Sequence, residues 1–350
     1  MEEAFGKTGK TLMSVLVFAA FLGSSGVVAF AQQQPNEPPC PNSRLAPYGL
    51  APDSHCNATG CLVPFKNYQW WTAFTFNPQE GYYNGGLGTI FAPEHVFVGG
   101  DGLHLKMAQD WNNNTQWAGA EAVLMFNANG TQANLGYGDY LVDAQLVSPP
   151  AANWANYDPN VATGMFTYER PATGPQQNSA RELDLAEISR WGWDHLTPAK
   201  CPFYGTNGVF NNTTLCDGSA QFALQDYTQA PGMVNRYDIG NITEVTLVMK
   251  WSAGAVTFEK YNGAHTFANL PPSPAYSWTP QNLSQFIPAP ACQRFHINLW
   301  LGNFYDTSWM MLPQFTPHAG PTNGQQVEVV IKNFQFCPNG VNCKQLSAPR

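Results

Sequence analysis

The sequence predicts an all-β protein, a sandwich or barrel of antiparallel strands. Short apolar runs alternate along the chain with turns rich in Gly, Asn, Asp and Pro, a rhythm typical of such folds. No long amphipathic helical pattern, internal repeat or phosphate-cradling glycine motif follows the N-terminal segment. One β domain can hold most of the 350 residues, because all-β domains of more than about 200 residues are common.

Composition indicates a folded chain and excludes two classes of partner. Charged residues make up 11% of the sequence and aromatic residues 13%, whereas disordered chains are rich in charge and poor in aromatics. The formal net charge is −8, and no cluster of Lys or Arg appears. Nucleic acid and anionic membrane surfaces are therefore excluded as partners.

The N-terminus has the pattern of a secretory signal peptide. Lys7 and Lys10 precede an apolar run over residues 12–22, and Ala29-Phe-Ala31 offers a small-residue cleavage site. An uncleaved membrane anchor is the competing interpretation, but the Gly and Ser residues at 23–26 interrupt the apolar run. We therefore expect cleavage, and a protein secreted to the extracellular space or the periplasm.

Three segments are expected along the chain. Residues 1–31 form the signal peptide, residues 32–64 a Pro/Gln-rich spacer with a disulfide-containing segment, and residues 65–350 the β-sandwich domain. The spacer assignment rests on its biased composition.

Eight cysteines follow the signal peptide, and an even number in an exported chain favours disulfides over a metal site. No Cys-x-x-Cys pair is present, which argues against zinc. Cys201–Cys216 and Cys337–Cys343 are the simplest local bridges. The partners of the other four cysteines stay open: Cys40, Cys56, Cys61 and Cys292.

Apolar runs of strand length recur through the domain. The expected strands span residues 68–76, 96–98, 103–107, 118–126, 135–147, 245–251, 255–261, 295–303 and 326–336. Asp101-Gly102 marks a hairpin turn, since this pair readily adopts positive φ angles. Residues 192–229 are expected to form a long loop along one rim of a cleft.

One further strand carries three carboxylates. Glu182 and Asp184 alternate with apolar Leu183, so both acids should project from one face of a half-buried strand. Glu187 breaks the alternation and would point into the core, where an unpaired carboxylate is costly. A β-bulge at Leu185-Ala186 would return Glu187 to the face of the other two acids.

This spacing suggests glycoside cleavage. Counted with the bulge, Glu182 and Glu187 stand about 13 Å apart between Cα atoms. If both side chains lean inward, their carboxyl groups could approach to about 5–5.5 Å, the separation of the two acids in retaining glycosidases. The alternatives are a solvated acidic strand, which repulsion between like charges disfavours, and a Ca²⁺ site.

The hexapeptide 182–187, Glu-Leu-Asp-Leu-Ala-Glu, resembles the Glu-x-Asp-x-x-Glu signature of glycoside hydrolase family 16 in its bulged, laminarinase-like and agarase-like form. The 96–107 hairpin and the 295–303 strand resemble the family's "dG-x-L-x-L" and "LNLAxGG" motifs. Residues 164–169 depart from the family, because both tryptophans of its Trp-Pro-Ala-x-Trp segment are missing. The resemblance covers about residues 65–337 and implies a jelly-roll-like β-sandwich of two curved antiparallel sheets with a concave substrate cleft.

The resemblance also implies roles for the three acids. Glu182 would be the nucleophile, Asp184 would assist it, and Glu187 would be the acid/base. Mutual repulsion raises the pKa of at least one acid in such a group, so Glu187 can hold a proton while Glu182 stays ionised. Glu182 would attack the anomeric carbon as Glu187 protonates the departing oxygen, and water would then release the sugar.

Five residues are candidates for substrate binding. His296, Asn298 and Trp300 share one face of their strand, opposite an apolar face that suits the core. Asn298 could hold a sugar hydroxyl, and His296 could be a hydrogen-bonded wall residue. Trp300, Trp191 and Trp193 offer flat faces to pyranose rings, with a core position as the alternative for each.

We therefore expect a secreted, retaining endo-glycosidase on β-linked polysaccharide, with β-1,3- or mixed-linkage glucan favoured by the bulged motif. Agarase, carrageenase and transglycosylase activities are alternatives on the same site. A non-catalytic, lectin-like sandwich and an anchored structural protein are alternatives from other classes. No cofactor and no metal are expected, polysaccharide is the expected partner, and the protein is expected to be a monomer.

Overall fold

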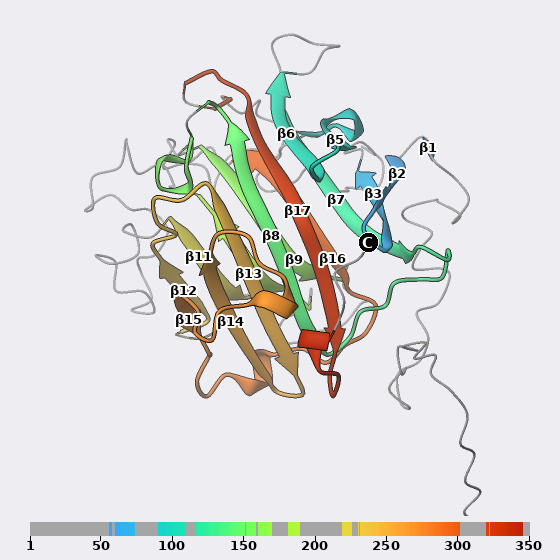
Figure 1. Ribbon diagram of the computed structural model, residues 1–350, viewed down its shortest axis with the longest axis vertical. Coiled ribbons are helices and arrows are strands. Elements are labelled where there is room, and N and C mark those ends of the chain that lie inside the picture. Colours follow the sequence, from blue (N-terminus) through green and yellow to red (C-terminus); the bar gives the residue numbers. More distant parts are fainter. Residues whose placement is uncertain are drawn as a thin grey trace, which may run out of the picture. The chain divides into compact units, whose positions relative to one another are not determined.

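The computed structural model describes twelve parts of the chain, all within the compact unit Asn36–Arg350. They are residues 56–57, 60–73, 90–109, 117–150, 152–158, 160–169, 181–189, 219–225, 230, 232–301, 320–321 and 323–345. Strands dominate them (Figure 1), and none of their helices is long and apolar enough to cross a membrane. The 3₁₀ helices are η3 (Pro93–His95), η4 (Trp154–Asn156), η6 (Phe267–Asn269), η7 (Ser284–Phe286) and η9 (Cys343–Gln345).

Nine of the described strands form the first sheet, in the order β1–β2–β3–β7–β16–β9–β10–β11–β12, and every pairing is antiparallel. Their bounds are β1 Cys56–Asn57, β2 Gly60–Phe65, β3 Tyr68–Ala73, β7 Trp117–Asn127, β16 Arg294–Leu301, β9 Val161–Tyr168, β10 Leu183–Ile188, β11 Ala220–Leu224 and β12 Val234–Tyr237. Strand β10 carries Asp184 and Glu187, and Glu182 directly precedes it, so the three carboxylates lie inside this sheet rather than at its edge.

The second sheet is also antiparallel and has the order β5–β6–β17–β8–β13–β14–β15. Its strands are β5 Val96–Val98, β6 Leu103–Gln109, β17 Val327–Pro338, β8 Gly138–Ser148, β13 Glu244–Ser252, β14 Ala255–Asn262 and β15 Tyr276–Trp278. In Figure 1, β17, β8 and β13 run side by side across the view. A short pairing of β6 with β7 joins the two sheets, and β4 (Ile90–Phe91) adds to β7 in parallel.

The core lies between the two sheets. Leu185 of β10 and Ile297 of β16 face it from the first sheet, and Val142 and Val329 face it from the second. Burial of each such side chain contributes about 1.5–3 kcal/mol to folding. The all-β, jelly-roll-like sandwich of two curved sheets is confirmed.

Alternation along each core strand decides what the other face of the first sheet carries. In β16, Phe295, Ile297, Leu299 and Leu301 belong to the core, so His296, Asn298 and Trp300 lie on the opposite face, as predicted. We call this the site face.

Most of the expected strands are confirmed, including the hairpins β5–β6 and β13–β14. The predicted loop over 192–229 is wrong in part, because residues 220–224 form β11 inside the first sheet. Strands β1, β2, β4, β9, β12 and β15 were not predicted. They are short or lack an extended apolar run, so neighbouring strands rather than their own pattern define them.

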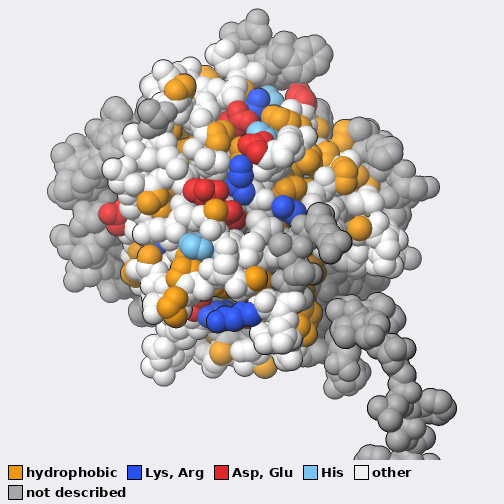
Figure 2. All heavy atoms as spheres, viewed as in Figure 1, with side chains coloured by type: hydrophobic (Ala, Val, Ile, Leu, Met, Phe, Trp, Pro, Cys, Tyr) orange, Lys and Arg blue, Asp and Glu red, His pale blue; other side chains and the backbone are white. Residues whose placement is uncertain are grey.

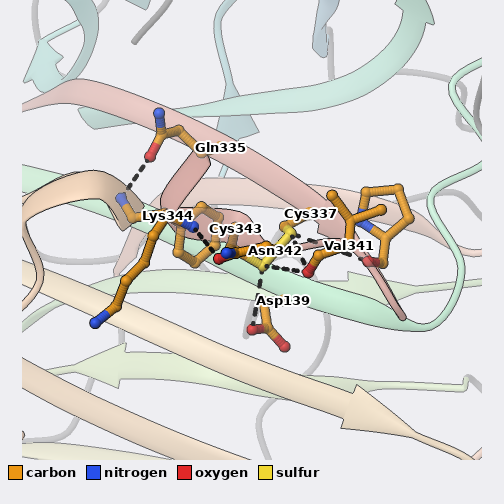
Figure 3. The surroundings of a disulfide bond; sticks show 9 residues. Asp139, Gln335, Cys337, Val341, Asn342, Cys343 and Lys344 are labelled. Carbon is orange, nitrogen blue, oxygen red and sulfur yellow. Dashed lines mark hydrogen bonds between the residues drawn. A yellow bond between two sulfur atoms is a disulfide. The ribbon is translucent and has the colours of Figure 1, made fainter. Parts of the chain in front are cut away.

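The C-terminal turn is closed by a disulfide between Cys337 and Cys343, as predicted (Figure 3). Cys343 Sγ also lies 3.6 Å from Asp139 Oδ2 of β8, and the Lys344 N–H donates to Asn342 Oδ1. Cys61 and Cys292 are disulfide-bonded too. The predicted Cys201–Cys216 bridge lies outside the described residues.

Acidic and basic side chains alternate on the side of the molecule seen in Figure 2. On the outside of the second sheet, His104 Nδ1 lies 2.7 Å from Glu328 and its Nε2 lies 2.8 Å from Asp101. Lys250 Nζ and Glu259 Oε1 are 2.6 Å apart on β13 and β14. The His104–Glu328 and Lys250–Glu259 contacts join neighbouring strands of the second sheet.

Candidate active site

A β-bulge places Glu187 on the site face. Asp184 pairs with Phe166 of β9, but Ala186 pairs with Met165 and Glu187 with Gly164, so β10 contains one extra residue here. The register with β11 shifts over the same stretch. The predicted bulge at Leu185-Ala186 is therefore confirmed, and the extra residue restores the orientation that alternation alone would have reversed.

The carboxyls of Glu182 and Asp184 are hydrogen-bonded to each other. Asp184 is only 1% exposed, and this burial is the largest cause of a pKa raised well above its ordinary value. The charges of Glu182 and Glu187 raise that pKa further. Asp184 is thus the acid that keeps its proton, and it donates this proton to Glu182.

Two glutamines, one in β11 and one directly after it, donate hydrogen bonds to the carboxyl groups of Asp184 and Glu187. Gln225 Nε2 donates to Asp184 Oδ2 at 3.0 Å, and Gln221 Nε2 donates to Glu187 Oε2. Gln221 and Gln225 lie four residues apart and so share a face of the strand. Their contacts with Asp184 and Glu187 confirm that both acids lie on the site face.

Opposing effects act on the Glu187 carboxyl. Burial raises its pKa above the ordinary value, and this is the largest cause. The hydrogen bond from Gln221 and the positive charge of Arg236 lower the pKa in part. Burial prevails, so Glu187 holds its proton to a higher pH than an ordinary glutamate does.

The backbone on both sides of Glu182 is held in place. Thr167 Oγ1 donates to the Arg181 carbonyl oxygen at 3.2 Å and accepts from the Leu183 N–H at 3.2 Å. The Glu182 carbonyl oxygen accepts from the Gln225 N–H. These bonds fix the chain from which the Glu182 side chain projects.

Arg181 adopts a strained backbone conformation next to Glu182. Its φ of 49° lies in the left-handed region, which costs a residue with a Cβ about 1–3 kcal/mol. An ion pair with Glu169, 2.9 Å between Nε and Oε2, and a hydrogen bond to the Ala289 carbonyl oxygen hold the side chain. Strain of this kind is typical of functional sites.

The predicted residue His296 is buried beside a carboxylate. Its Nδ1 lies 3.1 Å from Glu121 Oε1 of β7, and Phe166 stacks on its ring. With the Nδ1 proton directed at Glu121, Nε2 is left as an acceptor. His296 is 6% exposed, and its Nε2 contacts no hydrogen-bond partner among the described residues.

The predicted residue Asn298 stands across the sheet from Glu187, with Gly164 between them. A Cβ on Gly164 would lie 2.5 Å from Asn298 Oδ1, so the missing side chain makes room for this amide. Asn298 is 7% exposed, and its Oδ1 has no hydrogen-bond partner within the described part of the chain. A ligand hydroxyl would satisfy such a buried acceptor.

Trp300 is partly buried and packs against an apolar cluster on the same face. That cluster consists of Leu62, Trp71, Phe91, Val123, Met125 and Phe126. Both the predicted sugar platform and its core alternative fit this position, because one side of the indole is packed. The predicted binding residues Trp191 and Trp193 lie outside the described residues.

Several residues of the site were missed in the sequence. A signal existed for the two glutamines, because residues 220–225 alternate apolar side chains with Gln221, Ala223 and Gln225. Glu121 could have been noticed as the one charge in an apolar strand, 117–127. Thr167 and Arg236 carry no local signal, since only the strand pairing brings them to the acids.

The arrangement combines an acid that is held protonated, a neighbouring carboxylate and a third carboxyl with a raised pKa. Such a group can deliver one proton and one nucleophile to the same substrate bond. Among the described residues, no group of three His, Cys, Asp or Glu side chains is placed to hold a metal ion.

No protein-family model matches the chain, and no curated protein matches it. The chain is similar in fold to solved glycoside hydrolases of family 16. One is a prokaryotic β-1,3-1,4-glucanase (lichenase) from a mouse hindgut metagenome, with 15% identity, a TM-score of 0.45 and coverage of 80% of this chain and 99% of that chain. The laminarinase catalytic domain of Thermotoga maritima is 12% identical, with a TM-score of 0.46. The match spans 81% of this chain and 100% of the laminarinase chain.

A Bacteroides ovatus family 16 protein of a mixed-linkage glucan locus, solved with a G4G4G3G product, gives 15% identity and a TM-score of 0.43. The match spans 77% of this chain and 94% of the Bacteroides chain. These likenesses concern the general fold. The function therefore depends on the residues of the site itself.

Proposed function

We propose that the protein is a retaining endo-glycosidase of β-linked polysaccharide, with β-1,3- or mixed-linkage glucan as substrate. The observation that carries this proposal is the bulge in β10, which puts Asp184 and Glu187 on one face of the sheet, together with the hydrogen bond that joins Asp184 to Glu182 just before the strand. The Asp184 pKa is raised by burial and by the two neighbouring charges, while burial raises the pKa of Glu187. Two carboxyls for the chemistry and a third to assist are what double displacement needs.

In the proposed mechanism Glu182 attacks the anomeric carbon, and the O–H of Asp184 steadies the Glu182 carboxylate until the new bond forms. Glu187 gives its proton to the departing glycosidic oxygen. In the second half, Glu187 takes a proton from water, which attacks the same carbon and releases Glu182. His296 Nε2 and Asn298 Oδ1 accept sugar hydroxyls, and Trp300 contacts a ring face.

Reducing-sugar release from laminarin, lichenan, agarose and κ-carrageenan tests the activity, with Glu182→Gln as the matched variant. We expect cleavage of a glucan by the wild type and a loss of at least about 10³-fold in the variant, because the nucleophile is gone. Retention on one of these polymers without any cleavage would instead favour the lectin-like alternative.

We also propose that the mature protein is a secreted monomer that begins near Gln32. The supporting pattern is the basic, apolar and small-residue sequence of residues 1–31. N-terminal sequencing of exported protein and light scattering test this. Retained residues 1–31, or twice the monomer mass, would contradict it.

A further inference from the structure

Glu187 is the end of a chain of side-chain contacts that crosses three strands. Gln221 of β11 stands directly opposite Glu187 of β10 and donates its amide N–H to Glu187 Oε2. Arg236 of β12 stands directly opposite Gln221, and its Nε donates to Gln221 Oε1 at 2.9 Å. Gln221 is buried, so its amide makes these two contacts away from bulk water.

Arg236 decides how the Gln221 amide is oriented. A glutamine amide has an acceptor end and a donor end, and either could face Glu187. A guanidinium group has donors only, so the end of Gln221 that meets Arg236 must be Oε1. The NH₂ group is therefore directed at Glu187 whatever the protonation state of that carboxyl.

We propose that the pair Arg236–Gln221 fixes the catalytic proton on Glu187 Oε1, because Oε2 is already engaged by the amide N–H. A proton on Oε2 would compete with that donor for the same oxygen, whereas a proton on Oε1 leaves Oε2 as an unhindered carbonyl acceptor. Both residues are positioning residues, since they act through Glu187 and do not touch the substrate.

This inference rests on the proposed glycosidase function and states which atom performs the protonation. The Oε1 proton moves to the glycosidic oxygen as the bond from that oxygen to the anomeric carbon breaks. At the same time Glu182 forms its bond to the anomeric carbon, and Glu187 is left as a carboxylate with Oε2 still bonded to Gln221. The hydrogen bond from the Gln221 amide to Oε2 strengthens as this negative charge develops.

Removal of either positioning residue should therefore raise the pKa of Glu187. The Gln221 hydrogen bond and the Arg236 charge both lower that pKa against the effect of burial. The other titratable groups near Glu187 are Asp184 and Glu182 on its own segment and His296 on β16, beyond Gly164 of β9. These groups stay unchanged in the variants below.

The test uses the full chain with Gln221→Met, which keeps the size of the side chain, and with Arg236→Met and Arg236→Lys. An NMR titration of isotope-labelled glutamate carboxyls measures the titration midpoint of the Glu187 carboxyl. The Glu187 signal is identified as the one that disappears in Glu187→Gln. We expect a rise of about one pH unit in both Met variants and partial reversal in Arg236→Lys. Gln225→Met, which removes the amide from Asp184 instead, should not raise it.

Kinetics supply the second readout. In both Met variants, kcat/KM on a glucan should fall roughly 10- to 100-fold, and the alkaline limb of its pH profile should move upward. An aryl glycoside whose leaving group needs no proton should be affected far less. Equal losses on both substrates would overturn the proposal.

An unchanged Glu187 midpoint in Gln221→Met and Arg236→Met also overturns the proposal, whether or not the protein is active. If the wild type cleaves no polymer, the proposed function fails, but the NMR titration still decides whether Arg236 and Gln221 control Glu187. If Gln221→Met does not fold, Arg236→Met gives the same measurement, because Arg236 is partly exposed and its replacement disturbs the core less.

Discussion

Thr167 Oγ1 accepts the backbone N–H of Leu183 at 3.2 Å, and the same hydroxyl donates to the carbonyl oxygen of Arg181. One buried side chain on β9 therefore bonds both neighbours of Glu182. The position of the proposed nucleophile depends on this hydroxyl as well as on β10 itself.

Thr167→Val should lower both stability and turnover. The change keeps the shape of the side chain but leaves a buried N–H and carbonyl without this partner, which costs about 1–3 kcal/mol. We expect a lower Tm and a kcat reduced roughly tenfold, since Glu182 is less firmly placed. Thermal unfolding and glucan hydrolysis measure the two effects.

Thr163→Val is the matched control for this prediction. Thr163 lies on the same strand and is buried, but its Oγ1 bonds to the Tyr157 hydroxyl at 2.6 Å rather than to the Glu182 backbone. Its replacement should lower Tm with little change in kcat. If the two variants lowered kcat equally, the proposal that Thr167 positions Glu182 through its two backbone hydrogen bonds would be contradicted.

Asp184→Asn should stabilise the protein at alkaline pH while it impairs catalysis. The raised pKa of Asp184 means that folding stability is greatest at low pH and falls as pH rises and the buried carboxyl ionises. Asn removes this loss and can still donate to Glu182 and accept from Gln225, so we expect a gain of about 1–2 kcal/mol. Turnover should fall, since an amide N–H donates a weaker hydrogen bond to the Glu182 carboxylate than a carboxylic O–H does. A Tm below that of the wild type at alkaline pH would count against this account.

Gly164→Ala should act through Asn298. The new Cβ would lie 2.5 Å from Asn298 Oδ1, so the amide must move away from its place over Gly164. We expect a severalfold rise in KM for glucan, with a smaller effect on stability than a buried large-to-small change would have.

A double-mutant cycle with Asn298→Ala checks this explanation. If Gly164→Ala acts by displacing Asn298, its effect on KM should largely vanish once Asn298 is absent. Strictly additive effects would show that Gly164 matters for another reason.

Asp143 on β8 should make folding pH-dependent far from the site. It is 4% exposed, and its Oδ1 has no hydrogen-bond partner among the described residues. Burial and the charge of Glu244 raise its pKa to about 7 against the opposing charges of Lys332 and Lys66. Folding stability should therefore fall as pH rises from about 4 through about 7.

Asp143→Asn should remove that loss, which three pKa units would put at about 4 kcal/mol at most. Tm measured across this pH range should fall in the wild type and stay flatter in the variant. Asp101→Asn is a control of opposite sign, because the hydrogen bond from His104 lowers the pKa of the exposed Asp101. A parallel pH dependence in wild type and Asp143→Asn would contradict the prediction.

The fold and the acidic strand could be predicted because both rest on local patterns. Alternation assigned the two faces of β16, and the cost of a buried carboxylate at Glu187 required the bulge. The contact of Arg236 with Gln221 could not be predicted in the same way. Alternation over residues 220–225 marks Gln221, but Arg236 reaches the site only through the pairing of β11 with β12.

Two binding residues show the same limit of local reasoning. The face of Asn298 followed from its strand, but the room for its amide depends on Gly164 of another strand. His296 was predicted as a hydrogen-bonded wall residue, yet its partner Glu121 lies 175 residues away. Contacts of this kind are set by sheet order, which one sequence does not reveal.

The most direct test of the central proposal is the anomeric form of the first product. Glucan cleavage followed by NMR from the first minutes distinguishes double displacement, in which Glu182 forms a bond to the sugar, from direct attack by water. Double displacement on a β-linked glucan gives the β-anomer first, which then equilibrates with the α-anomer. An α-anomer that appears first, or a glucan left intact by the folded wild type, would contradict it.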